Sequence, residues 1–377
     1  MGNWGLYIHV PWCRRRCSYC DFYFEIGASQ TGFADRILTE YESKKASWPA
    51  QPPTTLYLGG GTPSLLDLDE LRKCLVELKR RTQAEDWEVT LEANPEDLDV
   101  SILENLKAVG IDRLSLGVQS FDDAVLNWLG RVHKGADAKR VIEEAQHVGF
   151  EKISIDLILG LPQEDVSRVH DELRWIQKFN LSHLSAYLLT VEPKTPLLKQ
   201  IENEKKMAPD SDQQADVYEA LQAQTVLMGL EQYEVSSWAK PGFESLHNRI
   251  YWSQGSYMGL GPGAHSCRVM QTGEVERRAN WPDLKRWWTQ AHTAHETELL
   301  PAQTAFKEAV AFGLRDMKRG ISVDELSTLH QVAIPGALLL SLEHLKSLAW
   351  LRYCNKRWYL TRQGALFADA VAREILS

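Results

Sequence analysis

Residues 11–22 read PWCRRRCSYCDF, and three of the six cysteines of the chain, Cys13, Cys17 and Cys20, fall within this stretch. Disulfides use cysteines in pairs and a closed structural zinc site takes four ligands, so three cysteines leave one ligand to be supplied from elsewhere. A buried helix would also bring these positions to one face, but Pro11 and the three arginines argue against a helix here. Zinc with a distant fourth ligand and an iron–sulfur cluster with one open iron remain as interpretations.

Six short runs rich in Leu, Ile and Val predict buried strands, and segments with helical periodicity separate them. The predicted strands are 6–10, 54–59, 87–93, 113–119, 152–160 and 183–189. The predicted helices between them include 32–48, 68–82, 97–110, 135–150 and 168–180. Strand–helix alternation favours a parallel sheet with right-handed crossovers. The sequence therefore predicts an α/β fold built on a partial (βα)6 TIM-like barrel, with a doubly wound open sheet as the alternative.

The chemically unusual residues follow the predicted strands. The cysteine stretch comes after the first strand, and GGGTP (59–63) comes after the second. Glu92 and Gln119 stand at the ends of the third and fourth strands, and Asp156 lies inside the fifth. In a barrel the strand ends share one rim, where active sites form. We therefore expect the functional site at that rim.

The rest of the chain predicts two further parts. Residues 1–230 hold the partial barrel, and residues 231–300, rich in Gly and aromatics, are interpreted as a segment that closes the barrel and connects it onward. Residues 301–377 predict a smaller, mainly helical domain in which a helix, a short hairpin and a last helix follow one another. That order is typical of a winged helix.

The composition excludes several classes of protein. Hydrophobic residues make up 44% of the chain and charged residues 25%, as in a globular protein, and the net charge of −9 argues against nucleic acid as a partner. No apolar run approaches the roughly 20 residues that a membrane helix needs. The first residues also lack the basic and apolar regions of a signal peptide. We therefore expect no transmembrane segment and a cytoplasmic location.

The spacing CxxxCxxC after the first strand resembles the radical S-adenosylmethionine (SAM) superfamily. The resemblance implies that Cys13, Cys17 and Cys20 hold a [4Fe–4S] cluster whose fourth iron binds SAM. In that superfamily the reduced cluster cleaves SAM to a 5′-deoxyadenosyl radical. GGGTP matches the glycine motif of the superfamily, whose backbone approaches the amino-acid end of SAM.

A longer set of motifs resembles the coproporphyrinogen III dehydrogenase branch of this superfamily. The set includes YIHVPWC, YLGGGTPS, LEANP, LGVQSFDD, LGRVH and IDLILGLP, in order from Tyr7 to Pro162. The resemblance implies that Tyr7, Gly60 and Glu92 contact the cluster-bound SAM. It also implies that the remainder of the SAM region is lined by Gly61, Thr62, Gln119, Arg131 and Asp156. Whether the chain binds a second SAM is left open.

Two families share these motifs, and the residues after Cys20 distinguish them. The dehydrogenase has another cysteine two positions after the third, together with a long segment before the motif, whereas here Asp21 and Phe22 follow Cys20 and twelve residues precede Cys13. Both features, together with HNRIYW (247–252) and GLGPGAH (259–265), are similar to the HemW-type heme chaperones. This resemblance implies delivery of heme to hemoproteins, with cluster and SAM retained. The alternative is a radical SAM enzyme that decarboxylates coproporphyrinogen III propionates to vinyl groups.

Three histidines are candidate ligands for a heme iron, because neutral imidazole is a common axial group. His247 and His265 lie among aromatic and glycine-rich stretches and are the favoured pair, whereas His9 lies inside the first strand, where a structural or SAM-site role is expected. The implied partners are heme and acceptor hemoproteins, with membrane respiratory proteins among the candidates. A homodimer is compatible with this interpretation. A role in electron transfer alone would leave the SAM-site residues without a purpose.

Overall fold

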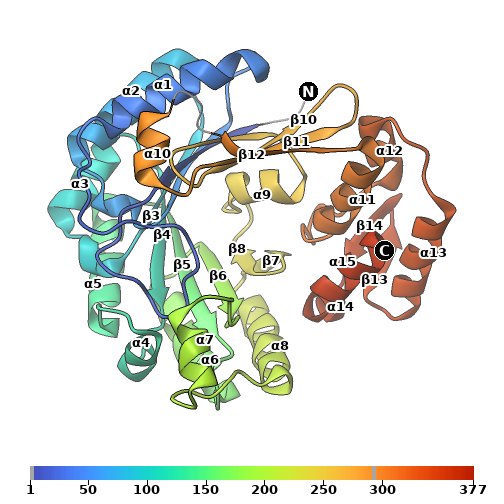
Figure 1. Ribbon diagram of the computed structural model, residues 1–377. Coiled ribbons are helices and arrows are strands. Elements are labelled where there is room, and N and C mark those ends of the chain that lie inside the picture. Colours follow the sequence, from blue (N-terminus) through green and yellow to red (C-terminus); the bar gives the residue numbers. More distant parts are fainter. Residues whose placement is uncertain (1–3, 291–293) are drawn as a thin grey trace.

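The computed structural model describes residues 4–290 and 294–377 (Figure 1). Residues 1–3 of the predicted barrel and 291–293 of the predicted connecting segment lie outside the described residues. The architecture is a large twisted sheet flanked by helices, followed by a group of helices and a hairpin at the carboxyl end of the chain. No helix in the described ranges combines the length and the apolar character needed to cross a membrane.

Six parallel strands form the centre of the sheet and pair in the order of the sequence. They are β1 (Gly5–Val10), β2 (Thr55–Gly60), β3 (Glu88–Ala93), β4 (Arg113–Gln119), β5 (Lys152–Leu159) and β6 (His183–Leu188). Each observed end lies within one residue of the predicted end. Their inner and outer faces are almost entirely buried, as expected when helices cover a parallel sheet. The predicted α/β architecture is confirmed.

The helices between the strands cover the outer face of the sheet. The main ones are α1 (Phe33–Lys44), α2 (Leu68–Thr82), α3 (Val100–Ala108), α5 (Gly135–Val148), α6 (Val166–Lys178) and α8 (Ser211–Leu227). Asp67, Asp99 and Asp165 cap α2, α3 and α6 by accepting backbone N–H bonds. The cap at Asp99 explains why α3 begins later than predicted, after the short 3-10 turn η3 (Pro95–Asp97). Two shorter helices, α4 (Asp123–Leu129) and α7 (Pro196–Glu202), follow β4 and β6.

The connecting segment extends the sheet at both edges. Next to β6 lie β8 (Ser237–Ala239) and β7 (Glu231–Glu234), and next to β1 lie β9 (Tyr257–Leu260), β10 (His265–Val269), β11 (Val275–Asn280) and β12 (Ala294–Leu300). The helix α10 (Leu284–Thr289) precedes β12. The order of strands runs from β12 to β7 and leaves these two as its ends. Each half of this segment thus adds strands to the nearest edge of the parallel sheet, and its role as the segment that closes the barrel remains a prediction.

The helix α9 (Leu246–Trp252) covers the amino ends of the parallel strands. The backbone N–H of Leu246 donates to Glu88 Oε1 at 3.0 Å, at the start of β3. His247 bonds Thr55 at the start of β2, with 2.7 Å between Nδ1 and Oγ1. Arg113, at the start of β4, donates to the carbonyl of Phe243 just before α9. The amino end of the sheet is thereby capped by α9 and the residues before it.

The last part of the chain is helical with one β-hairpin. It contains α11 (Ala302–Gly313), α12 (Val323–His330), α13 (Gly336–Ser347), β13 (Leu351–Cys354), β14 (Arg357–Leu360), α14 (Arg362–Leu366) and α15 (Ala368–Leu376). The two strands pair antiparallel and belong to no other sheet. Three helices followed by a hairpin match the predicted winged-helix-like organisation. The boundaries after residues 230 and 300 remain predictions.

Candidate cofactor site

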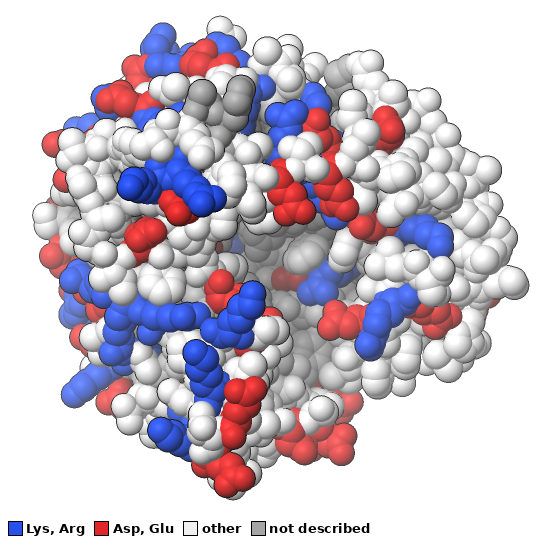
Figure 2. Space-filling view, in the orientation of Figure 1, with Lys and Arg blue, Asp and Glu red and all other residues white. Residues whose placement is uncertain are grey.

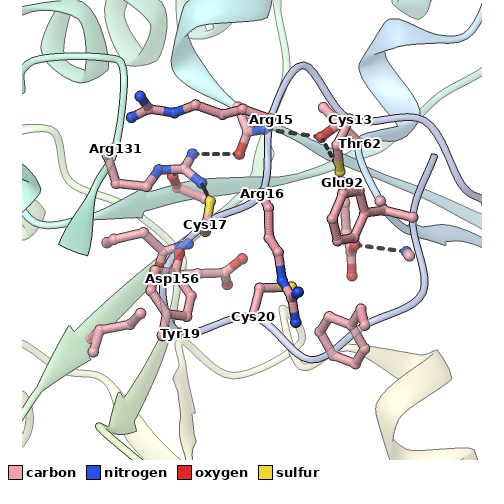
Figure 3. Close-up of a pocket in the computed structure, with 18 of the residues that line it drawn as sticks. Cys13, Arg15, Arg16, Cys17, Tyr19, Cys20, Thr62, Glu92, Arg131 and Asp156 are labelled. Atoms are coloured by element: carbon pink, nitrogen blue, oxygen red, sulfur yellow. Dashed lines mark hydrogen bonds between the residues drawn. The ribbon is translucent and has the colours of Figure 1, made fainter. Parts of the chain in front are cut away.

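A pocket of about 490 Å³ opens at the carboxyl ends of the parallel strands (Figure 3). Its lining comes from the loop after β1, the loop after β2 and the ends or following loops of β3, β4, β5 and β6. Ten of the predicted site residues line it: Cys13, Cys17, Cys20, Gly60, Gly61, Thr62, Glu92, Gln119, Arg131 and Asp156. The rim predicted from the strand ends is thus where these residues meet.

The cysteine loop is held by backbone hydrogen bonds and is not helical. Cys13 N donates to the carbonyl of Glu25 at 2.9 Å, and Glu25 N donates to Pro11 at 2.7 Å. Farther along, Ser18 Oγ donates to the carbonyl of Leu129 at 2.9 Å. These bonds tie the loop to itself and to the end of α4. The loop therefore stands as a fixed wall of the pocket.

The glycine loop after β2 packs directly against the cysteine loop. Gly61 N donates to Val10 O and Thr62 N donates to Trp12 O, each at 2.8 Å. A Cβ at Gly61 would lie 2.7 Å from the carbonyl oxygen of Pro11, so a larger residue cannot fit without moving the backbone. Gly60 has a φ of +110°, which only glycine adopts readily. Close packing of two loops is thus one physical reason for the glycines, in addition to the predicted approach to SAM.

The three thiols are free and partly exposed on one wall of the pocket. Thr62 Oγ1 donates to Cys13 Sγ at 3.5 Å. Burial raises the pKa of the Cys13 thiol and raises that of Cys20 to about 11. At neutral pH these thiols keep their protons in the metal-free chain, and a metal ion that binds them must displace the protons.

The arginines between the cysteines contact neighbouring loops, and none of their hydrogen bonds among the described residues goes to a sulfur atom. Arg14 forms an ion pair with Asp97. Arg15 donates to the carbonyl of Gly130, and Arg16 donates to that of Lys194 at 3.2 Å. Their side chains are long enough to reach across to neighbouring loops, so closeness in sequence did not predict their partners.

Arg131, which is distant in sequence from the cysteines, contacts one of their sulfur atoms. Its Nη1 donates to Cys17 Sγ at 3.4 Å, and its Nη2 donates to Asn94 Oδ1 at 2.5 Å and to Gly117 O at 3.1 Å. Glu96 Oε2 lies 3.7 Å from the same nitrogen. The buried Nε has no hydrogen-bond partner among the described residues. A guanidinium fixed in this way presents positive charge to a sulfur atom.

His133 supports this arrangement and was not identified from the sequence. It is 3% exposed, its Nδ1 lies 3.0 Å from Glu96 Oε2, and its Nε2 lies 2.9 Å from Val118 O. It therefore orients the carboxylate that faces Arg131. Its place at the end of the LGRVH motif was the available signal.

Two half-buried carboxyl groups face the interior of the pocket from β3 and β5. Glu92 accepts from Tyr57 OH at 2.7 Å and from Gly60 N at 3.2 Å, and burial raises its pKa to about 7. Asp156 accepts from Ser115 Oγ at 3.2 Å, and burial raises its pKa to about 6. Such carboxylates attract a cationic ligand, because a nearby positive charge offsets the cost of their burial.

Tyr57 is a second residue that the sequence did not single out. Its ring stacks on His247, with 5.0 Å between centroids, and lies 6.2 Å from the ring of Tyr7. Tyr7 does not line the pocket but lies below it, with its hydroxyl 3.2 Å from His9 Nδ1. Tyr57 therefore positions Glu92, and Tyr7 supports Tyr57.

The predicted heme ligands lie outside the pocket. His247 is 0% exposed at the amino end of the sheet, and its Nε2 lies 2.8 Å from Tyr251 Oη while its Nδ1 bonds Thr55. Iron ligation by His247 would require one of these bonds to break. His265, at the start of β10, is exposed. His9 is buried, with its Nε2 2.9 Å from the carbonyl of Tyr23, as expected of a structural histidine.

The donor set fits an iron–sulfur cluster with one open position. Three thiols come from one loop, Arg131 offsets negative charge beside Cys17, and the carboxyl groups of Glu92 and Asp156 line the pocket that these thiols face. Iron–sulfur clusters are normally held by four cysteines, so three thiols would leave one iron accessible from the pocket.

Comparison with known proteins supports this arrangement. Residues 7–176 match the radical SAM superfamily. Over 97% of both chains, the sequence is 33% identical to the heme chaperone HemW of Bacillus subtilis (strain 168). The chain belongs to the HemW family of the radical SAM superfamily. Another member of the HemW family, from Escherichia coli (strain K12), is 29% identical over 99% of this chain and 98% of its own.

The fold also has a solved counterpart outside the HemW family. The structure of coproporphyrinogen III oxidase (HemN) from Escherichia coli, described as a radical SAM enzyme, aligns with a TM-score of 0.80. The alignment covers 100% of this chain and 90% of that one, at 20% sequence identity. This likeness shows a shared fold.

Proposed function

We propose that this protein binds heme and delivers it to acceptor hemoproteins, with a [4Fe–4S] cluster and SAM bound in the pocket at the carboxyl ends of the strands. The observation that carries the proposal is the match to HemW proteins, named heme chaperones, along nearly the whole chain. Asp21 and Phe22 after Cys20 add support, because the dehydrogenase motif has another cysteine there.

In this proposal Cys13, Cys17 and Cys20 ligate three irons of the cluster, and the fourth iron receives SAM. When bound and reduced, a cluster held by these residues would supply one electron to SAM. Arg131 holds a positive charge beside the Cys17 ligand, which favours the deprotonated sulfur. Thr62, whose hydroxyl contacts Cys13 Sγ, orients the first ligand.

SAM carries an ammonium group and a sulfonium, and Glu92 supplies the carboxylate that suits them. The other residues proposed for its binding region are Tyr7, Gly60, Gly61, Thr62, Gln119, Arg131 and Asp156. Tyr7 acts indirectly here, because it lies under Tyr57 and does not line the pocket. The placement of Glu92 and Asp156 in one pocket, where desolvation raises the pKa of both, supports the proposal, since a cation would offset the cost of their negative charge.

Anaerobic turnover with coproporphyrinogen III tests the proposal against its alternative. The cluster-loaded protein, SAM and a reductant are incubated with coproporphyrinogen III, and the divinyl product is assayed. In parallel, heme is titrated into the same protein and the Soret band is followed. We expect heme binding without product. Formation of the divinyl product would replace the chaperone proposal with the oxidative decarboxylase.

His265→Ala and His247→Ala test the predicted iron ligands. If His265 is the ligand, its replacement shifts the Soret maximum and leaves thermal stability unchanged, because the side chain is exposed. Replacement of His247 removes a buried, doubly bonded ring, so a stability loss is expected whether or not it binds iron. A Soret shift in His247→Ala alone, at a temperature where the variant is folded, would assign the iron to His247.

The remaining parts of the proposal concern partners. We propose a cytoplasmic protein that hands heme to hemoproteins, with membrane respiratory proteins among the candidate acceptors, and that binds no nucleic acid. A homodimer is the proposed oligomeric state. Sedimentation velocity and heme transfer to apo-acceptors test these points.

A further inference from the structure

The rim of the pocket carries two guanidinium groups without carboxylate partners. Arg14, Arg15 and Arg16 all line the pocket and are exposed. Arg14 pairs with Asp97, but among the described residues no carboxylate oxygen lies within 4 Å of Arg15 or Arg16. Their recorded hydrogen bonds go to the backbone carbonyls of other loops. Both groups are therefore free to pair with an anionic ligand.

The same rim exposes apolar side chains. Phe22 is 64% exposed and Val132 is 52% exposed, and both line the pocket together with Phe24. The guanidinium carbon of Arg16 lies 5.9 Å from the centre of the Phe24 ring. Figure 3 shows Arg16 extending in front of Cys20, and Figure 2 shows Lys and Arg side chains gathered beside the central hollow of this face. Apolar and basic groups thus share one edge of the pocket.

The interior below the rim has a different character. Glu92, Asp156, Arg131 and Asn94 line it with polar and charged groups. A volume of about 490 Å³ lies in the range that encloses one drug-sized ligand, and the cluster and SAM of the proposed function occupy it. A planar macrocycle must therefore remain outside, at the rim.

We propose that the rim binds heme, with Phe22, Phe24 and Val132 against the macrocycle and with Arg15 and Arg16 paired to the two propionates. This inference rests on the proposed function and assigns the place where heme sits. An arginine fork matches a carboxylate with two parallel hydrogen bonds, and aromatic rings stack on a flat π-system. A ligand with an apolar face and two carboxylates is complementary to these groups. The rim lies at the carboxyl ends of the strands and His247 lies at their amino ends, so this inference excludes His247 as the iron ligand, and assignment of the iron to His247 would overturn it.

Heme and its dimethyl ester separate the contribution of the propionates. Both ligands are titrated, in the same mild detergent, into cluster-loaded wild-type protein, the R15Q/R16Q double variant and the control Arg174→Gln. Arg174 lies on the exposed surface of α6, so its replacement removes a comparable charge away from the pocket. Iron content of the three proteins checks that the cysteine loop is intact.

We expect wild-type protein to bind heme about tenfold or more tightly than the ester, because charge-assisted hydrogen bonds are among the strong ones. In the double variant the affinity for heme falls to that for the ester, while the affinity for the ester is unchanged. Arg174→Gln leaves both affinities as in wild type. Phe22→Ser weakens both ligands to the same degree, since it acts on the macrocycle.

Two outcomes would overturn the inference in different ways. If the double variant binds heme and keeps the full preference over the ester, the rim does not hold the propionates, while the proposed function stands. If wild-type protein binds neither ligand, the proposed function fails, and the rim proposal fails with it.

Discussion

Glu88 begins β3 and Glu92 lies one residue before its end, and both point to the same side of the sheet because they are four residues apart. Glu88 is buried and Glu92 is half-buried, and desolvation raises the pKa of each. Glu88 has protein partners for its carboxylate: it accepts from the N–H of Leu246 and lies 3.6 Å from Lys152 and 4.0 Å from Arg113. Glu92 has Tyr57 and Gly60 as partners, has no cation within 4 Å among the described residues, and lines the open pocket.

The two ends of the sheet differ in the same way. At the amino end α9 supplies partners for the polar groups of the strands, and His247 is bonded through both nitrogens. At the carboxyl end the polar groups surround a space large enough for a ligand. A buried polar residue is therefore identified as structural or functional by its partners and not by its type.

The largest effect is expected from replacing a cysteine of the pocket at the carboxyl ends of the strands. Cys17→Ala should abolish the brown chromophore and reduce iron after anaerobic reconstitution to the level of a cluster-free protein, because two thiols cannot hold the cluster. Cys354→Ala is the matched control, since Cys354 is exposed in the hairpin and isolated. Unchanged iron in Cys17→Ala would mean that the ligand assignment is wrong.

Glu92→Gln is expected to weaken SAM binding about 10- to 100-fold near pH 8, because it replaces a charged acceptor by a neutral group. The matched Glu88→Gln variant should leave SAM affinity unchanged and lower thermal stability, since the contacts of Glu88 all lie at the amino end of the sheet. Equilibrium dialysis with labelled SAM gives both affinities. Equal losses of SAM affinity in the two variants would contradict the distinction between the amino and carboxyl ends of the sheet.

The same pair predicts a pH-dependent stability. The folded-state pKa of Glu92 is about 7 and lies above the ordinary 4.5, so the wild-type protein binds this proton more tightly when folded. Its free energy of unfolding therefore falls as pH rises through this interval. Glu92→Gln lacks this loss, so its stability relative to wild type should rise between about pH 4.5 and pH 8, by up to about 3 kcal/mol for 2.5 pKa units. Urea denaturation of the SAM-free protein at both pH values measures the change; a constant difference would contradict it.

Tyr57→Phe and Tyr251→Phe should give the smallest effects and separate the two ends most finely. Tyr57→Phe removes a hydrogen bond that lowers the pKa of Glu92, so SAM affinity should fall about fivefold near neutral pH and recover at higher pH. Tyr251→Phe removes the partner of His247 Nε2 and should leave SAM affinity unchanged. Dialysis across a pH series tests both. A pH profile in Tyr57→Phe that matches wild type would show that Tyr57 does not act through Glu92.

Much of the site at the carboxyl end of the sheet could be predicted from sequence, because short motifs next to each strand indicate it. Strand–helix alternation gave the six parallel strands to within one residue, and ten of the predicted site residues meet in the pocket. The carboxyl ends of parallel strands lie at the same edge of the sheet, so residues that follow the strands meet there and their contacts did not have to be known in advance.

The amino end could not be predicted in the same way. His247 meets Thr55 and Tyr57 across nearly two hundred residues of sequence, and nothing near it indicates a helix that covers the strands. The arginines of the cysteine stretch show the same limit at short range: Arg15 and Arg16 reach other loops, and the distant Arg131 contacts Cys17. Partner choice depends on tertiary packing, which the local pattern does not encode.

The electron paramagnetic resonance spectrum of the reduced, cluster-loaded protein, recorded with and without SAM, tests the central claim most directly. The claim is that Cys13, Cys17 and Cys20 leave one iron open to SAM beside Glu92. The account predicts that SAM changes the spectrum of wild-type protein and that Glu92→Gln needs a higher SAM concentration for the same change. A spectrum that saturating SAM leaves unaltered would contradict the claim.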